Sequence, residues 1–312
     1  MGELVDGKWL DEDQLNRADG KFVRKPSQFR GAIGDAGYPA ESGRYQLFVS
    51  HACPWAHRAV IFRVLKRLED HIGLTVVSPF MLENGWEFGG TEDPKGDKDP
   101  FGNFAYLHQY YTKAQSDYTG RVTVPLLWDT KTETAVNNES SEIIRMFNSA
   151  FETDTPDYYP EGLRGEIDEI NDYVYSRINN GVYKAGFATT QEAYNEAVLA
   201  LFEALDAIDA RLGKHRYLVG DTLTEADWRL FTTLLRFDPV YVSHFKCNLR
   251  RIADYPNLSG YLHDLYQHDG VAATVDMAHI KTHYFASHKK INPTGIIPMG
   301  PDLDLTKPHG RG

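Results

Sequence analysis

The pair of residues with the clearest chemical meaning is Cys53-Pro54, which stands between a β-rich segment and an amphipathic segment. Proline suits the first residue of a helix, because its missing N–H would have no partner there. Cys53 would then cap the helix and face both unpaired N–H groups and the positive end of the helix dipole. Both favour a thiolate, and cysteine pKa values fall below about 8.5 at helix N-termini. The motif predicts a nucleophilic cysteine, with a buried, inert thiol as the alternative.

The residue three positions after Cys53 is Ala56, so this motif cannot close an internal disulfide. A dithiol oxidoreductase is therefore excluded, and any disulfide intermediate needs an external thiol. A cysteine hydrolase that uses His51 or His57 as its base is disfavoured, because no orienting carboxylate is identifiable. Monothiol chemistry at Cys53 is the prediction that remains.

Two further motifs would complete a site for a thiol peptide. Val124-Pro125 opens a strand-like segment, and a cis bond there would turn the N–H and C=O of Val124 toward an extended ligand. A trans proline at a sheet edge is the alternative. Glu139-Ser140 enters a helix, where Ser140 would hold a carboxylate and Glu139 an ammonium group, although Ser140 or Ser141 would also serve as a plain N-cap. Together the motifs describe a pocket for a zwitterionic γ-glutamyl group beside a thiolate, which fits glutathione.

The elements expected around these motifs form a small α/β domain followed by a helical one. Strands are expected at 45–50, 74–78 and 122–128, and a helix beginning at Cys53-Pro54 joins the first two into a β-α-β unit. A long polar insert occupies 80–120. Beyond a linker, helical periodicity dominates at 162–180, 190–213, 224–236 and 256–268. Within this half, Thr224 and Asp227 are spaced as a capping box.

Composition limits the class of protein. The chain has 312 residues, of which 42% are hydrophobic and 25% charged, which is typical of a globular chain of two domains. The net charge of −11 disfavours nucleic-acid binding. Two cysteines cannot form a disulfide framework, and neither a secretory pattern nor an apolar run of about 18 residues is present. We therefore expect a cytoplasmic protein that does not bind membranes.

Signals for other cofactors are weak. The glycine-rich motifs GxGxxG and GxxxxGK[ST] are absent, so no nucleotide cofactor is expected. His279 and His283 are four residues apart, and Asp276 precedes them, but no other feature supports a metal site and none is expected. Cys247 lies in the helical half without a proline or a helix start, and we interpret it as a packing residue.

The order of these motifs resembles that of the cysteine-type glutathione transferases. A strand is followed by CPWAHR at 53–58, by Val124-Pro125, by Glu139-Ser140 and by an all-helical half. Three longer strings resemble the xi class, the glutathionyl-hydroquinone reductases, and the resemblance covers nearly the whole chain. They are MLENGW at 81–86, NNGVYKAGFAT at 179–189 and HYFASHKKINPTGIIP at 283–298.

The resemblance implies a fold class of α/β plus all-α, with a thioredoxin-like domain before a helical glutathione-transferase domain. It also implies a homodimer. The expected segments are an N-terminal extension at 1–43, the thioredoxin-like glutathione-binding domain at 44–150, a linker at 151–160, an all-helical domain contributing to the hydroquinone site at 161–290, and a tail at 291–312.

The resemblance further implies reductive deglutathionylation of S-glutathionyl-hydroquinones, with glutathione as co-substrate. Cys53 would take the glutathionyl group as a mixed disulfide, and a second glutathione would release it as glutathione disulfide (GSSG). The hydroxyls of Tyr183 and Tyr284 match the family's phenol-binding tyrosines and complete the catalytic set. The positions that match its glutathione-binding residues are Trp86, Arg121, Val124, Pro125, Glu139 and Ser140.

Two alternative functions remain open. One is an omega-like thioltransferase or dehydroascorbate reductase that uses the same Cys53, although the presence of Tyr183 and Tyr284 disfavours it. The other is a non-catalytic glutathione-transferase-like binding module. Such a module would be expected to lose its nucleophile, whereas Cys53 and its helix start are intact.

Overall fold

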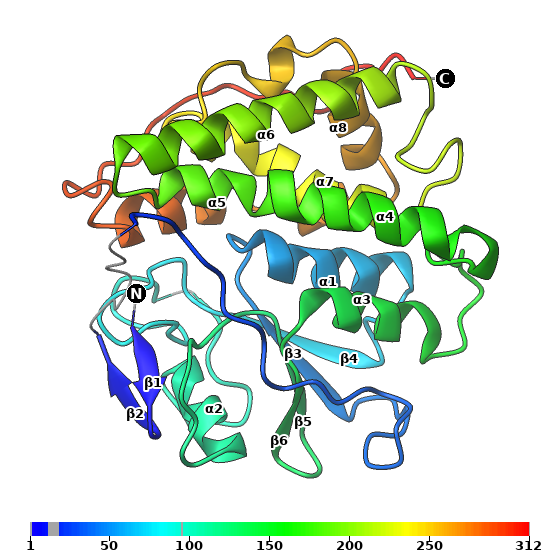
Figure 1. The fold of residues 1–312 in the computed structure, drawn as a ribbon. Helices are drawn as coiled ribbons and strands as arrows, with labels where there is room; N and C mark the ends of the chain where they lie inside the picture. Colours follow the sequence, from blue (N-terminus) through cyan, green and yellow to red (C-terminus); the bar gives the residue numbers. More distant parts are fainter. Residues whose placement is uncertain (1, 12–18, 95, 312) are drawn as a thin grey trace. The chain divides into compact units, whose positions relative to one another are not determined.

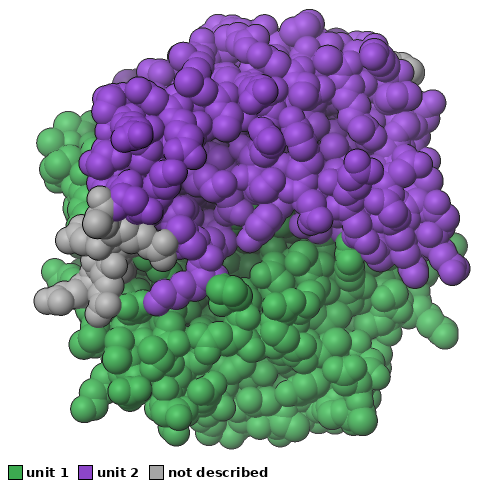
Figure 2. All heavy atoms as spheres, in the orientation of Figure 1, with its two compact units in different colours: residues 1–14, 26–155, 274–297 green, residues 15–25, 156–273, 298–312 purple. Residues whose placement is uncertain are grey.

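The computed structural model describes residues 2–11, 19–94 and 96–311 (Figure 1). Contacts within the chain divide it into two compact units, each assembled from segments that are not contiguous in sequence (Figure 2). The first unit contains the described residues among 1–14, 26–155 and 274–297. The second contains those among 15–25, 156–273 and 298–312.

A four-stranded mixed sheet is the centre of the first unit, in the order β4-β3-β5-β6. Strand β3 (Tyr45–Val49) runs parallel to β4 (Ile72–Val76) and antiparallel to β5 (Leu126–Asp129), which pairs antiparallel with β6 (Thr134–Asn137). All five residues of β3 are buried, as expected of a strand covered on both faces.

Helix α1 (Pro54–Leu65) connects β3 to β4, which confirms the predicted β-α-β unit. It begins at a proline and ends where Arg67 adopts a left-handed conformation (φ 53°). Helices α1 and α3 (Ser140–Ser149) pack together on one face of the sheet (Figure 1). Helix α2 (Leu107–Ala114) packs against the other face through Tyr110, whose ring contacts Phe48 and Trp128.

Several expected boundaries differ from the structure. The strand expected at 74–78 begins earlier, at Ile72, and the one expected at 122–128 begins only at Leu126, because Pro125 has no N–H to donate to a ladder. The insert at 80–120 contains helix α2, which its polar composition hid. The N-terminal extension forms a hairpin of β1 (Glu3–Val5) and β2 (Lys8–Leu10).

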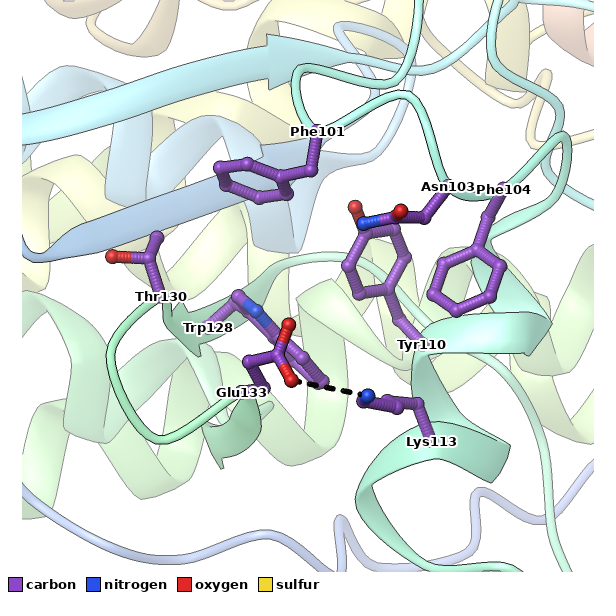
Figure 3. Close-up of a pocket in the computed structure, with 8 residues that line it drawn as sticks. All are labelled: Phe101, Asn103, Phe104, Tyr110, Lys113, Trp128, Thr130 and Glu133. Carbon is purple, nitrogen blue, oxygen red and sulfur yellow. Dashed lines mark ion pairs between the residues drawn. The ribbon is translucent and has the colours of Figure 1, made fainter.

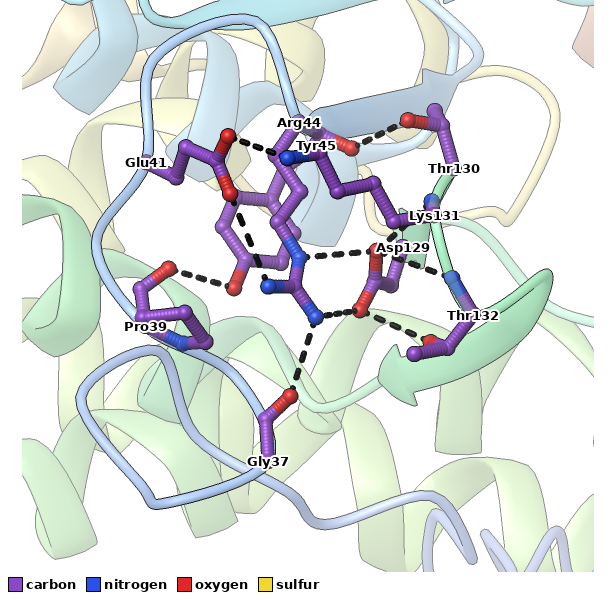
Figure 4. A network of polar contacts seen from close by, with 9 residues as sticks. All are labelled: Gly37, Pro39, Glu41, Arg44, Tyr45, Asp129, Thr130, Lys131 and Thr132. Carbon is purple, nitrogen blue, oxygen red and sulfur yellow. Dashed lines mark hydrogen bonds and ion pairs between the residues drawn. The ribbon is translucent and has the colours of Figure 1, made fainter.

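A buried ion pair holds the start of β3 to the end of β5 (Figure 4). Arg44 Nε lies 3.0 Å from Asp129 Oδ1, and the Asp129 side chain has no exposed surface. Burial raises the pKa of Asp129, but the hydrogen bonds that it accepts from Arg44, Lys131 and Thr132 outweigh this and lower the pKa overall. Tyr45 donates to the carbonyl of Pro39 at 2.7 Å, so the network also holds the segment before β3.

The second unit is helical, and the described residues after 150 form no β-strand. Its α-helices are α4 (Arg164–Val174), α5 (Gly181–Gly186), α6 (Gln191–Leu212), α7 (Glu225–Arg236) and α8 (Leu258–Tyr266). Its shorter 3₁₀ and π segments are Glu161–Leu163, Tyr175–Asn179, Phe237–Tyr241, Ile252–Asp254 and Ala272–Thr274, the last of which ends at the boundary with the first unit.

The predicted capping box at the start of α7 is confirmed. The Thr224 side chain accepts from Ala226 N, and Asp227 accepts from Thr224 N at 2.9 Å. Asp227 is fully buried, and it also accepts from Leu218 N and the Tyr261 hydroxyl. The carboxylate therefore joins the cap of one helix to the middle of another.

Candidate active site around Cys53

Cys53 is the N-cap of α1, as its sequence context predicts. Its backbone is extended (φ −77°, ψ 118°), Pro54 is the first helical residue, and the carbonyl of Cys53 accepts from His57 N at 3.0 Å. The side chain is half-buried, and the two cysteines are not joined in a disulfide. The thiol thus lies at the positive end of the helix dipole with part of its surface open.

Val124, of the Val124-Pro125 motif, contacts the sulfur atom of Cys53. Cys53 Sγ lies 3.3 Å from the carbonyl oxygen of Val124 and donates to it. The Val124-Pro125 peptide bond is cis, the isomer that the sequence left open. Residues 71 positions apart are therefore adjacent in the structure.

The third motif differs in one respect from expectation. The N-cap of α3 is Glu139, not Ser140 or Ser141, because the Glu139 carboxylate accepts from Ser141 N at 3.2 Å and is a stronger acceptor than a hydroxyl. Ser27 donates to its other oxygen at 3.1 Å. The Ser141 hydroxyl also donates to the first oxygen at 3.0 Å, so Glu139 would hold a ligand ammonium group alongside three hydrogen bonds.

Ser140 is the first residue of α3, and it is buried with its hydroxyl toward α1. Arg58 Nη1 lies 3.4 Å from Ser140 Oγ, and the Arg58 guanidinium stacks over the Trp55 ring at 4.4 Å. Because Arg58 and Cys53 lie at the same end of α1, this buried cation links the cysteine's helix to the candidate carboxylate site. Arg121 is half-buried close to Val124 in sequence.

A segment from the far end of the chain completes the cysteine's surroundings. Helix α9 (Met277–Thr282) belongs to the first unit, and His279 Nε2 lies 3.0 Å from Ser50 Oγ. Ser50 Oγ also accepts from Ala52 N at 3.2 Å, and the rings of His51 and His279 are 5.4 Å apart. His279 thus contacts the turn that leads into Cys53. Sequence reasoning considered His279 only as a metal ligand and missed this contact and Ser50.

The π-helical segment after α9 (His283–Ser287) carries a second group of contacts within the first unit. The rings of Trp86 and His283 stack at 4.9 Å, and His283 Nδ1 lies 3.0 Å from the carbonyl of Pro79. Tyr284 is 2% exposed, and its ring contacts those of His283 and His288. Trp86 and Tyr284, two candidates from distant strings, therefore belong to one cluster.

His279 and His283 are four residues apart, a spacing that could suit two metal ligands. In the structure they have different partners, since His279 contacts Ser50 and His283 contacts Pro79. Among the residues that the structure describes, no three His, Cys, Asp or Glu side chains are grouped so that they would hold a metal ion. None of the helices formed by these residues combines the length and the apolar character that crossing a bilayer requires.

Tyr183 is the one candidate in the second unit. It lies in α5, is 9% exposed, and packs among the rings of Phe22, Phe187, Tyr241 and Phe245. The Arg24 guanidinium lies 5.2 Å from its ring. The other eight candidates lie in the first unit, so the structure brings the glutathione candidates, Cys53 and Tyr284 into one compact body.

Both halves of the chain match known families. Residues 52–150 match the glutathione S-transferase N-terminal domain, and residues 191–264 match the glutathione S-transferase C-terminal domain. The chain is 54% identical to glutathionyl-hydroquinone reductase YqjG of Escherichia coli (strain K12), over 100% of this chain and 98% of that protein.

Solved structures give the same result. The glutathione-bound structure of the Escherichia coli protein superposes with a TM-score of 0.91 at 52% identity, covering 99% of each chain. A xi-class glutathione transferase from Natrialba magadii superposes with a TM-score of 0.94 at 48% identity, covering 100% of this chain and 97% of that one. The predicted fold class is confirmed as that of a glutathione transferase. The chain belongs to the xi-class glutathione transferases, the family of the glutathionyl-hydroquinone reductases.

Proposed function

We propose that this protein catalyses the glutathione-dependent reductive deglutathionylation of S-glutathionyl-hydroquinones, with Cys53 as nucleophile. The observation that carries the proposal is the position of Cys53, which caps α1 with its sulfur 3.3 Å from the carbonyl of Val124. It is supported by the 54% identity, over the whole chain, to a protein named for this activity. Glutathione is the co-substrate, in keeping with the glutathione-bound structure of that relative.

The reaction has two steps. The Cys53 thiolate attacks the sulfur of the conjugate, an S–S bond forms, and the bond from sulfur to the ring carbon breaks with its electron pair on the ring. The ring carbon takes up a proton, and the free hydroquinone leaves. The thiolate of a second glutathione then attacks the glutathionyl sulfur of the mixed disulfide, which gives GSSG and restores Cys53. In sum, one conjugate and one glutathione become one hydroquinone and one GSSG.

We assign the remaining candidates by their chemistry. The backbone of Val124 would pair with the extended tripeptide, Ser140 beside Arg58 would bind the γ-glutamyl carboxylate, and Glu139 its ammonium group. Trp86 would pack on the tripeptide backbone, and Arg121 would pair with the glycyl carboxylate. The hydroxyls of Tyr183 and Tyr284 would donate to the phenolic oxygens, which stabilises the ring as the carbon–sulfur bond breaks.

We also propose that the protein is a homodimer in the cytoplasm. The support for the dimer is the resemblance to the family, and the support for the compartment is the presence of only two cysteines, not joined in a disulfide. Light scattering coupled to size-exclusion chromatography tests the dimer, and a monomeric mass would contradict it.

The decisive experiment offers the protein three substrates with glutathione: an S-glutathionyl-hydroquinone, hydroxyethyl disulfide and dehydroascorbate. The expected result is free hydroquinone and GSSG in equal amounts. Reduction of the other two substrates without hydroquinone release would instead establish the omega-like activity. If none of the three substrates were turned over, the remaining function would be that of a non-catalytic binding module.

A further inference from the structure

A cavity lies on the α2 side of the sheet, wholly within the first unit (Figure 3). It is formed by the segment before α2, by α2 itself and by the end of β5 with the turn that follows it. Its volume is about 320 Å³. An apolar cavity of about 150 Å³ already binds benzene, so this one accommodates a single substituted ring.

Four of its eight lining residues are aromatic. The ring of Tyr110 is the floor, and the rings of Phe104 and Trp128 stand edge-on to it at 5.0 and 4.9 Å. Phe101 lies at 6.5 Å from Tyr110 and is 40% exposed, which places it at the mouth. Aromatic rings prefer these edge-to-face and offset contacts, so the wall suits another aromatic ring.

The hydroxyl proton of the floor residue is already donated within the protein. The Tyr110 hydroxyl donates to Asp99 Oδ1, while Asp99 Oδ2 accepts from the backbone N–H groups of Asn103 and Phe104 at 2.7 and 2.8 Å. Asp99 therefore fixes the loop that carries Phe101 and Phe104 and occupies the hydroxyl of Tyr110. Polar recognition of a ligand would therefore come mainly from the groups at the mouth.

At the mouth stands an ion pair between Lys113 of α2 and Glu133 of the β5–β6 turn, 3.1 Å apart (Figure 3). Glu133 has φ 50°, a left-handed conformation that favours glycine or asparagine over a residue with a long side chain. The turn thus carries a carboxylate at the cavity in a backbone position where glycine would be less strained. Asn103 and Thr130 add an amide and a hydroxyl to the lining.

The ion pair, whose side chains are 45% and 60% exposed, favours one kind of ring over others. A cationic ligand would compete with Lys113 for Glu133, and an anionic ligand would compete with Glu133 for Lys113. A neutral hydroxyl donates to the carboxylate and accepts from the ammonium group, so it joins the pair without breaking it. We propose that this cavity is a binding site for a neutral single aromatic ring that carries a hydroxyl group, a phenol or a hydroquinone.

The site is separate from Cys53. Trp128 pairs with Gln46 near the beginning of β3, whereas Cys53 follows the other end of that strand. The proposal therefore does not rest on the proposed function, and its test needs no turnover.

The test is a titration followed through the indole N–H signals of the five tryptophans by NMR. A Trp128→Phe variant identifies the Trp128 signal. Phenol and hydroquinone are expected to shift this signal saturably below about 10 mM, an affinity ordinary for a single ring. Binding near Cys53 would move the Trp55 and Trp86 signals instead, so the two sites are read separately.

Variants of the mouth test the role of the ion pair. Glu133→Gln and Lys113→Met should each weaken phenol binding about fivefold, the loss expected for one charged hydrogen bond. Glu41→Gln is the matched control, since Glu41 also pairs with a lysine, Lys131, but does not line the cavity. A Trp128 signal that phenol does not move would overturn the proposal. Tighter binding of benzylamine or benzoate, or unchanged affinity in both mouth variants, would overturn it as well.

Discussion

The two cysteines of this chain are the same residue type in opposite environments. Cys53 caps α1 in the first unit, half-buried, with Pro54 after it and the Val124 carbonyl 3.3 Å from its sulfur. Cys247 lies in the second unit with no exposed surface, and its sulfur is 3.8 Å from the carbonyl of Phe245. Burial raises the pKa of the Cys247 thiol well above its ordinary value of 9.0.

The comparison shows that two local features separate a reactive thiol from a packing residue. The first is the backbone: a helix N-terminus presents N–H groups and a positive dipole end, whereas Cys247 follows an irregular turn in which Lys246 has φ 59°. The second is solvent access, because a thiol that reagents cannot reach does not react, even when it is deprotonated.

The largest expected effect is on turnover. Cys53→Ser should lower the rate of hydroquinone release about a thousandfold or more, because an alcohol at this position does not form the disulfide intermediate. Cys247→Ala is the matched control and should retain turnover within about twofold, since truncation of a buried side chain that takes no part in the proposed steps changes stability rather than rate. Coupled assay of GSSG formation measures both. Equal losses in the two variants would remove the distinction between the cysteines.

Alkylation tests the environments without any substrate. Iodoacetamide should modify Cys53 at least about a hundredfold faster than Cys247 in the folded protein, and the rates should converge in denaturant. Mass spectrometry of the two peptides gives the rates. Their dependence on pH also tests the lowered pKa that the helix N-terminus predicts for Cys53. An alkylation midpoint near 8.5 would contradict that prediction.

His279 should have a smaller effect, through the turn before Cys53. His279→Ala removes the partner of Ser50, whose hydroxyl accepts from Ala52 N, and kcat should fall about five- to tenfold, as for the loss of one hydrogen bond. Ser50→Ala should give a similar loss.

His71→Ala is the control, because His71 makes the same kind of bond with Ser42, at 2.7 Å, elsewhere in the first unit. Turnover of this variant should stay within about twofold of wild type. A wild-type rate in the His279→Ala variant would show that the turn before Cys53 does not need its contact with α9.

The smallest effect concerns stability. Cys247→Ala should lower the free energy of unfolding by about 1–2 kcal/mol near pH 7, because it leaves a small cavity. The folded thiol has a raised pKa, so its contribution is complete below pH 9.0 and is lost as the pH rises above it, where the unfolded chain releases the proton. The difference between wild type and variant should therefore shrink by up to about 1.4 kcal/mol per pH unit above that value. Urea unfolding at several pH values tests this, and a constant difference would contradict it.

Much of the site was predictable because its signals are local. Proline after cysteine fixes a helix start within two residues, and Thr224 with Asp227 satisfies backbone groups three residues apart, so neither depends on the rest of the fold. The β-α-β unit and the helices of the second half follow from periodicities of a few residues. The cap of α3 was assigned to the wrong residue because Glu139, Ser140 and Ser141 are all good caps, and only the backbone path decides among them.

The sequence by itself therefore determined the thiol, its helix and the succession of elements, since these depend on neighbours along the chain. The tertiary structure decided which distant segments meet. Ser50 and His279 are 229 residues apart, and no local pattern indicates that α9 returns to the unit that contains Cys53. The aromatic cavity likewise needs a loop, a helix and a strand end from one unit, and the polar composition of 80–120 conceals the rings that face inward there. Contacts across such separations depend on the path of the whole chain, and they leave no periodicity or motif in the local sequence.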